Sequence, residues 1–107
     1  MVAGIVSGSH FFLIATVRNE IIGMGRAISD RTSDAYIQDI TVEEGFRGRG
    51  IGSAIVEKLT AALKAEGIEW IGLIAEKGSR RFYEKIGFAP MSGAEPMLKS
   101  APWNSNS

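Results

Sequence analysis

ITVEEGFRGRGIGSAIVEKL, residues 40–59, joins a β-branched run to an amphipathic helical run through a loop rich in glycine and arginine. The loop glycines stand at alternate positions: Gly48, Gly50 and Gly52. Glycine allows positive φ and a close approach of the backbone, so successive N–H groups can point at one ligand at the start of a helix. With the helix N-terminus and the side chains of Arg47 and Arg49, the loop is predicted to bind a phosphate or pyrophosphate.

Two common nucleotide-binding loops do not fit this spacing. The chain contains no G-x-x-x-x-G-K-[ST] motif, and G-x-G-x-x-G would need a glycine where Ser53 stands. The loop is therefore interpreted as an anion-binding turn of another class, placed between a strand and a helix.

Upstream of the loop, the sequence has the composition of β-strands. Phe11–Val17 and Ile21–Ile28 are separated by the short polar turn RNE, which predicts a β-hairpin. A third run, Ala35–Val42, follows the polar loop SDRTSD. Three antiparallel strands are therefore predicted before the glycine loop.

Downstream of the loop, the period becomes helical. An apolar stripe begins at Ile51, and Gly67 offers a C-terminal stop, so a helix is predicted to about Glu66. The stripe consists of Ile51, Ile55, Leu59 and Ala62/Leu63. Ile68–Ala75 is almost continuously apolar, as expected of a buried parallel strand that follows a crossover helix.

A short helix and two closing strands are predicted after this strand. The helix covers SRRFYEKI, with Ser79 as its N-cap and Gly87 just past its end. Phe88–Met91 and Pro96–Lys99 are predicted to pair through SGAE, and residues 100–107 are predicted to form a flexible tail. The predicted element order is β-β-β-α-β-α-β-β.

Length and composition restrict the class of protein. A chain of 107 residues is expected to form one domain, residues 1–107, and its twelve basic and twelve acidic residues give no net charge that would attract nucleic acid or membrane. Because it has no cysteine and only one histidine, His10, no metal site is expected. The apolar opening lacks a basic n-region and is too short to span a bilayer, so the protein is predicted to be cytoplasmic.

Two sequence motifs follow one another along the chain, the first in the glycine loop and the second in the predicted short helix. Arg47-x-x-Gly50-x-Gly52, after a strand that ends in DITV, resembles the acyl-coenzyme A loop of the GNAT superfamily of N-acetyltransferases. RRFYEKIGF, residues 80–88, resembles the second signature of that superfamily, an aromatic pair on a short helix followed by Gly-Phe. The resemblance implies an α+β fold with a mixed, mainly antiparallel sheet of the GNAT acyltransferase type, here shortened at its N-terminus.

The resemblance also implies an activity: direct transfer of an acetyl group from acetyl-coenzyme A (acetyl-CoA) to a primary amine, without a covalent enzyme intermediate. The backbone of the strand that precedes the loop is expected to pair with pantetheine as an added strand would. A backbone N–H near Val42 is expected to stabilise the negative charge on the thioester oxygen. The implied cofactor-binding residues are Ile40, Thr41, Val42, Arg47, Gly48, Arg49, Gly50, Ile51, Gly52, Ser53 and Tyr83.

Two side chains are assigned to proton transfer. The family counterpart of Tyr83 protonates the departing thiolate, so the resemblance implies Tyr83 as the general acid. Asp39 and Glu43 are the carboxylates that could take the proton of the attacking amine. Asp39 is preferred because it lies within QDITV, on the strand that is expected to line the cleft.

The chain departs from the family pattern in two places. GNAT domains usually begin with a strand and one or two helices, for which the residues before His10 are too few. The apolar strand that starts at Phe11 would then have an uncovered edge or face, so a homodimer is predicted, in which a second copy covers it. Glu76 stands about where many family members carry a pantetheine-binding asparagine, so that contact is not predicted here.

Other interpretations stay open. The chain could be a non-catalytic acyl-CoA-binding or interaction module, or a fragment of a larger acetyltransferase. The alternative to the dimer is a monomer whose last residues, including Trp103, fold back over the exposed surface. The acceptor could be a small amine, an amino acid, an antibiotic, a polyamine or a protein N-terminus.

Overall fold

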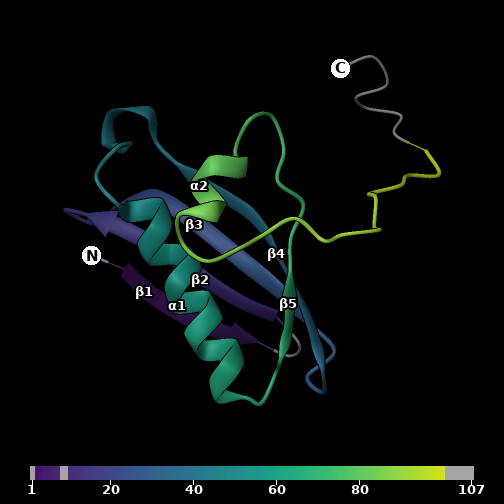
Figure 1. Ribbon diagram of the computed structural model, residues 1–107. Helices are drawn as coiled ribbons and strands as arrows, with labels where there is room; N and C mark the ends of the chain where they lie inside the picture. The colour runs from purple at the N-terminus through teal and green to yellow at the C-terminus, as the bar shows by residue number, and fades with distance from the viewer. Residues whose placement is uncertain (1, 8–9, 101–107) are drawn as a thin grey trace.

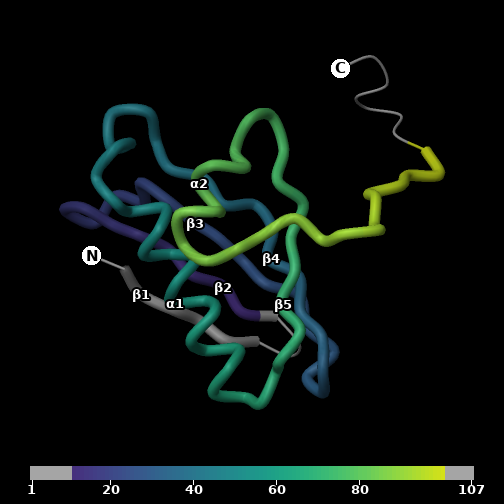
Figure 2. Tube along the Cα trace, viewed as in Figure 1, coloured from purple at the N-terminus to yellow at the C-terminus, as the bar shows by residue number. Residues whose placement is uncertain are grey.

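The structure, a computed structural model, describes the backbone of residues 2–7 and 10–100 and the side chains of residues 11–100 (Figures 1 and 2). Five strands form one sheet in the order β1-β2-β3-β4-β5. The strands are β1 (Val2–Ser7), β2 (His10–Val17), β3 (Glu20–Ser29), β4 (Asp34–Val42) and β5 (Trp70–Gly72). Neighbouring strands from β1 to β4 are antiparallel, and β5 is parallel to β4. The predicted fold class, α+β with a mixed and mainly antiparallel sheet, is confirmed.

The long helix α1 (Ile51–Ala65) connects β4 to β5 and lies across one face of the sheet (Figure 1). It packs against β2, β3 and β4. Its buried residues, Ile55, Val56, Leu59 and Leu63, follow the predicted apolar stripe. Gly67, at φ +86°, follows the helix end, in agreement with the predicted C-terminal stop.

The core lies between this helix and the sheet. Alternate residues of β2, Phe11, Leu13 and Ala15, point toward α1 and are buried. They are joined by Ile22 and Ala27 of β3, Ala35 and Ile37 of β4, the four buried residues of α1, and Ile68. The other face of each strand, which carries Phe12 and Tyr36, is not covered by a helix among the described residues.

The N-terminal prediction was wrong in one respect. A strand does precede Phe11: β1 pairs with β2 from Val2, opposite Ala15, to Ser7, opposite His10. The edge of β2 is therefore paired. Only two residues separate β1 from β2, so no helix lies between these strands, which agrees with the predicted N-terminal shortening.

The C-terminal prediction also needs correction. β5 has only three residues rather than the eight of Ile68–Ala75, and α2 (Arg80–Glu84) ends earlier than predicted. Phe88–Met91 and Pro96–Lys99 are not strands. Proline lacks the N–H donor that a sheet ladder needs. The exposed segment 89–100 first passes beside β5, where part of it borders a pocket with Tyr36 and Trp70, and then extends away from the sheet (Figure 1). Of the predicted tail, residues 100–107, all but residue 100 lie outside the described residues, and so does Trp103.

Candidate active site

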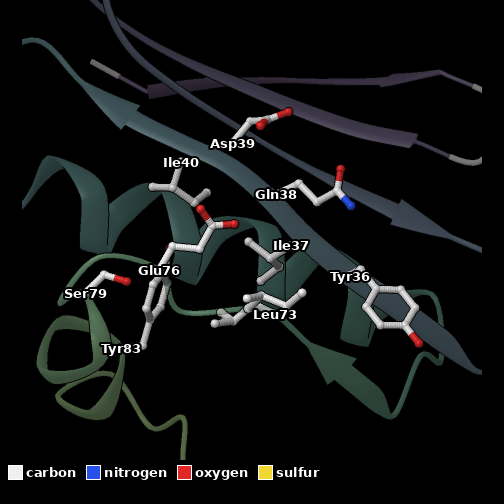
Figure 3. A pocket seen from close by; sticks show the side chains of 10 residues that line it. Tyr36, Ile37, Gln38, Asp39, Ile40, Leu73, Glu76, Ser79 and Tyr83 are labelled. Carbon is white, nitrogen blue, oxygen red and sulfur yellow. The ribbon is translucent and has the colours of Figure 1, made fainter. Parts of the chain in front are cut away.

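The sheet opens into a cleft where β4 and β5 stop pairing. The parallel register runs from Asp34, opposite Trp70, to Tyr36, opposite Gly72, and ends there. Residues 73–76 then leave β4, and a cleft of about 400 Å³ lies between them (Figure 3). Its lining residues are Tyr36, Ile37, Gln38, Asp39, Ile40, Leu73, Ile74, Glu76, Ser79 and Tyr83. An extended ligand in this cleft would pair with the exposed backbone of β4.

A β-bulge in β4 helps to separate the two strands. Arg26 lies opposite Gln38 and Met24 opposite Thr41, so Asp39 and Ile40 together face the single residue Gly25. Asp39 has φ +58°, in the left-handed region. A bulge bends the strand that carries it and increases its twist. The bend therefore falls on the stretch of β4 that lines the cleft.

Gly25, which faces the bulge, has no room for a side chain. A Cβ atom at position 25 would lie 2.5 Å from Cδ1 of Ile40 and 2.6 Å from Cγ2 of the buried Ile55. The absence of a side chain on β3 thus leaves room for the Ile40 side chain to pack toward α1.

The glycine loop lies between the end of β4 and the start of α1, after the short 3₁₀ helix η1 (Glu44–Phe46). Gly48 and Gly50 have φ +78° and +80°, and Gly50 is the N-cap of α1. A Cβ at either position would meet no atom within 4 Å. The loop therefore presents open, positive-φ backbone at the positive end of a 15-residue helix, which fits a phosphate group.

The two loop arginines differ in their contacts. Nε of Arg47 donates a hydrogen bond to the carbonyl oxygen of Val42 at 2.8 Å, which ties the loop to the end of β4. The guanidinium carbon of Arg49 lies 5.4 Å from the ring centroid of Phe46. Arg47 thus has a structural contact in addition to its predicted part in anion binding.

The two sequence motifs meet in space. A Cβ at Gly52, in the first turn of α1, would lie 3.2 Å from Cζ of Phe82 on α2. Gly52 therefore allows α2 to approach the start of α1, with Ile51 and Ser53 half-buried on either side. This contact holds the second motif next to the glycine loop.

Tyr83, on α2, forms part of the cleft wall. Its ring makes edge-to-face contacts with Phe82 and Phe88, with centroids 4.9 and 5.9 Å apart. Burial, and then the negative charge of Glu76, raise the pKa of the Tyr83 phenol above its ordinary value of 10.0. The hydroxyl is therefore protonated at neutral pH, as a proton donor must be.

Asp39 lines the cleft but is engaged elsewhere. One of its carboxylate oxygens, Oδ2, accepts a hydrogen bond from Nε of Arg26 at 2.7 Å, and an Nη of Arg26 also donates to Gln38 at 3.1 Å. Figure 3 shows the Asp39 side chain on the far side of β4 from Tyr83. No sequence pattern indicated this ion pair, because the bulge sets the direction of the Asp39 side chain.

Within the described residues, no group of three or more potential ligands could hold a metal ion. In the same part of the chain, no helix has the length and hydrophobicity needed to cross a bilayer.

Comparison with known proteins agrees with this geometry. The profile of the Acetyltransferase (GNAT) family matches residues 5–88. The chain is 39% identical over 71 residues to "Histone acetyltransferase TAP1" of Glycine max, covering 66% of this chain and 31% of that protein. It is 42% identical over 69 residues to "GCN5-related N-acetyltransferase 2, chloroplastic" of Arabidopsis thaliana, covering 64% and 27%. The chain thus spans less than a third of the length of these two relatives.

Among solved structures, the fold matches a "predicted acetyltransferase with acetyl-CoA" from Clostridium acetobutylicum with a TM-score of 0.74 and 25% identity, covering 84% of this chain and 64% of that one. The family match covers most of the chain and includes both motifs that border the cleft. This chain belongs to the GNAT family of acetyltransferases.

Proposed function

We propose that this chain transfers an acetyl group from acetyl-CoA to a primary amine. The observation that supports the proposal is that three features lie together: the cleft beside β4, the open glycine loop at the start of α1, and Tyr83 in the cleft wall. Two similar proteins support it: the Clostridium acetyltransferase was solved with acetyl-CoA, and the Glycine max relative is named a histone acetyltransferase.

The residues present fit acetyl-CoA. The loop from Arg47 to Ser53 would hold the pyrophosphate through backbone N–H groups, and the β4 backbone at Ile40, Thr41 and Val42 would pair with pantetheine. Acetyl-CoA supplies the acetyl group as a thioester, already activated for attack by an amine. The chain supplies orientation, a backbone N–H near Val42 toward the thioester oxygen, and a proton from Tyr83 for the sulfur.

Three further assignments remain proposals. We propose a homodimer, now on the ground that the sheet face opposite α1 carries exposed apolar residues such as Phe12, Tyr36 and Trp70. The predicted cytoplasmic location and the assignment of Asp39 as the base also stay predictions.

The binding test compares two variants with the same backbone strain. In Gly50→Val and Gly67→Val, a β-branched residue replaces a glycine of positive φ that has no atom within 4 Å of its Cβ position. These glycines lie at opposite ends of α1, and only Gly50 lies in the loop. We expect Gly50→Val to abolish acetyl-CoA binding in calorimetry and Gly67→Val to retain it. Equal affinities in the two folded variants would refute the loop assignment.

The activity test is a screen of primary amines with thiol release as the readout. Release that depends on an amine supports the transferase. Tight acetyl-CoA binding without release for any amine supports instead a non-catalytic acyl-CoA-binding module.

A further inference from the structure

The charged groups of the cleft have one sign. Among its lining residues, only Asp39 and Glu76 are charged, and both are acidic. A primary amine of ordinary basicity arrives as an ammonium ion, since its pKa is close to that of lysine, about 10.4. Because Arg26 pairs with Asp39, the Glu76 carboxylate is the charge that would attract this protonated form, which must lose a proton before it can attack a thioester.

The two carboxylates are placed differently toward Tyr83. Asp39 is paired with Arg26 at 2.7 Å and extends away from Tyr83 (Figure 3). Glu76 extends into the cleft beside the Tyr83 ring, toward Ile40 on β4 (Figure 3). Within the described residues, no cation lies within ion-pair distance of the Glu76 carboxylate.

A backbone turn carries Glu76 at the entrance to α2. Its carbonyl oxygen accepts a hydrogen bond from the backbone N–H of Ser79 at 3.0 Å, in the turn that leads into α2. The neighbouring arginine on α2, Arg80, is paired with Glu84 at 2.9 Å. Arg26 and Arg80 are thus both paired with other carboxylates, and the Glu76 charge acts on Tyr83, whose pKa it helps to raise.

We propose that Glu76, rather than Asp39, accepts the proton of the acceptor amine, and that Glu76 and Tyr83 relay this proton to the leaving sulfur. The acceptor is accordingly a primary amine that binds as an ammonium ion. This inference rests on the proposed acetyltransferase function.

The relay balances. The Glu76 carboxylate takes one proton from the ammonium group, and the neutral nitrogen forms a bond to the acetyl carbon while the carbon–sulfur bond breaks. The Tyr83 hydroxyl gives its proton to the sulfur, and the protonated Glu76 returns a proton to the Tyr83 oxygen. The second proton of the amine passes to water, so the sum is an ammonium ion and acetyl-CoA giving an amide, the free thiol and one proton.

The kinetic test uses three charge-neutralising variants of the full chain: Glu76→Gln, Asp39→Asn and Glu57→Gln. Glu57 is an exposed residue of α1 outside the cleft lining and controls for loss of one negative charge. For any amine that the parent acetylates, we expect Glu76→Gln to lower kcat/KM about a hundredfold. Asp39→Asn should lose less than about tenfold, and Glu57→Gln should match the parent.

Acetyl-CoA affinity distinguishes proton transfer from cofactor binding. We expect Glu76→Gln to bind acetyl-CoA as tightly as the parent in calorimetry. A loss of affinity equal to the loss of kcat/KM would overturn the proposal and make Glu76 a cofactor contact. A larger kinetic loss in Asp39→Asn than in Glu76→Gln would also overturn it and return the proton to Asp39.

A titration without acetyl-CoA tests the relay independently of activity. The chain has two tyrosines, so a Tyr36→Phe background leaves Tyr83 as the only phenol that ionises. Ultraviolet titration should show a lower Tyr83 pKa when Glu76→Gln is added to this background. An unchanged Tyr83 pKa overturns the relay even if the parent acetylates amines. Failure of every amine with the parent, beside a shifted Tyr83 pKa, overturns the transferase and with it the role of Glu76.

Discussion

At the scale of single residues, the Tyr83 hydroxyl is the group on which the proposed chemistry most directly depends. Tyr83→Phe keeps the ring contacts with Phe82 and Phe88 but removes the proton donor. We expect kcat to fall about a hundredfold while acetyl-CoA affinity stays unchanged. Tyr36→Phe, which removes the other phenol of the cleft, should have a smaller effect on kcat. A Tyr83→Phe variant as fast as the parent, where chemistry limits the rate, would leave Tyr83 with packing alone.

The raised pKa of Tyr83 predicts how stability and kcat change at high pH. Burial and the Glu76 charge raise its pKa in the folded protein above the ordinary 10.0 of an unfolded chain. Its contribution to stability is therefore complete below pH 10 and is lost as the pH rises through the folded value. The alkaline limb of kcat that belongs to Tyr83 should accordingly lie above pH 10, and Glu76→Gln should move it to lower pH.

Single residues differ in how far the sequence alone could place them. The loop glycines were predicted from their spacing and Tyr83 from the resemblance to the GNAT superfamily, because both lie in short local motifs. The ion pair of Asp39 with Arg26 was not, because it depends on a bulge and on the register of two strands. Glu76 was recognised only as a departure from a family pattern, and its position beside Tyr83 needed the tertiary structure.

At the scale of elements, α1 and the hairpin of β2 and β3 were predictable from hydrophobic period and turn residues. β1 was missed because a short run containing Gly4 carries little β-signal until it pairs with β2. The two closing strands were predicted from composition, but Pro90 and Pro96 lack backbone N–H donors, and the structure leaves this segment outside the sheet.

The bulge of β4 yields the prediction for this scale. Gly25→Ala would place a methyl group against Ile40 and the buried Ile55, so it should lower the free energy of unfolding by about 1–3 kcal/mol. It should also weaken acetyl-CoA binding, because Ile40 lines the cleft. Gly45→Ala, where a Cβ meets no atom within 4 Å, is the control and should change stability by less than about 0.5 kcal/mol. Equal unfolding midpoints in urea for the two variants would contradict this account of Gly25.

At the scale of the whole molecule, the sheet is covered on one face only. Helix α1 packs on the face that carries Phe11, Leu13 and Ile37, while Phe12, Tyr36 and Trp70 point to the other face and are 36 to 48% exposed. From the sequence, either an edge or a face was predicted to be uncovered at the strand that starts at Phe11, and β1 occupies the edge. The dimer is therefore proposed from the uncovered face. Neither the composition nor the hydrophobic period of the sequence could show whether the face or the edge is uncovered.

The open face makes the dimer testable by substitution. Phe12 lies opposite Arg26 in the register of β2 and β3, so Phe12→Lys would add a charge beside the Arg26–Asp39 ion pair, in a surface that a second copy would have to bury. Met97→Lys adds the same charge to the exposed segment 89–100, where Met97 is 88% exposed. By light scattering at micromolar concentration, we expect a dimeric mass for the parent and for Met97→Lys, and a monomeric mass for Phe12→Lys with its secondary structure retained. Dissociation by Met97→Lys alone would move the interface to segment 89–100, and a monomeric parent with full activity would reject the dimer, because an active site complete in one copy has no need of a second.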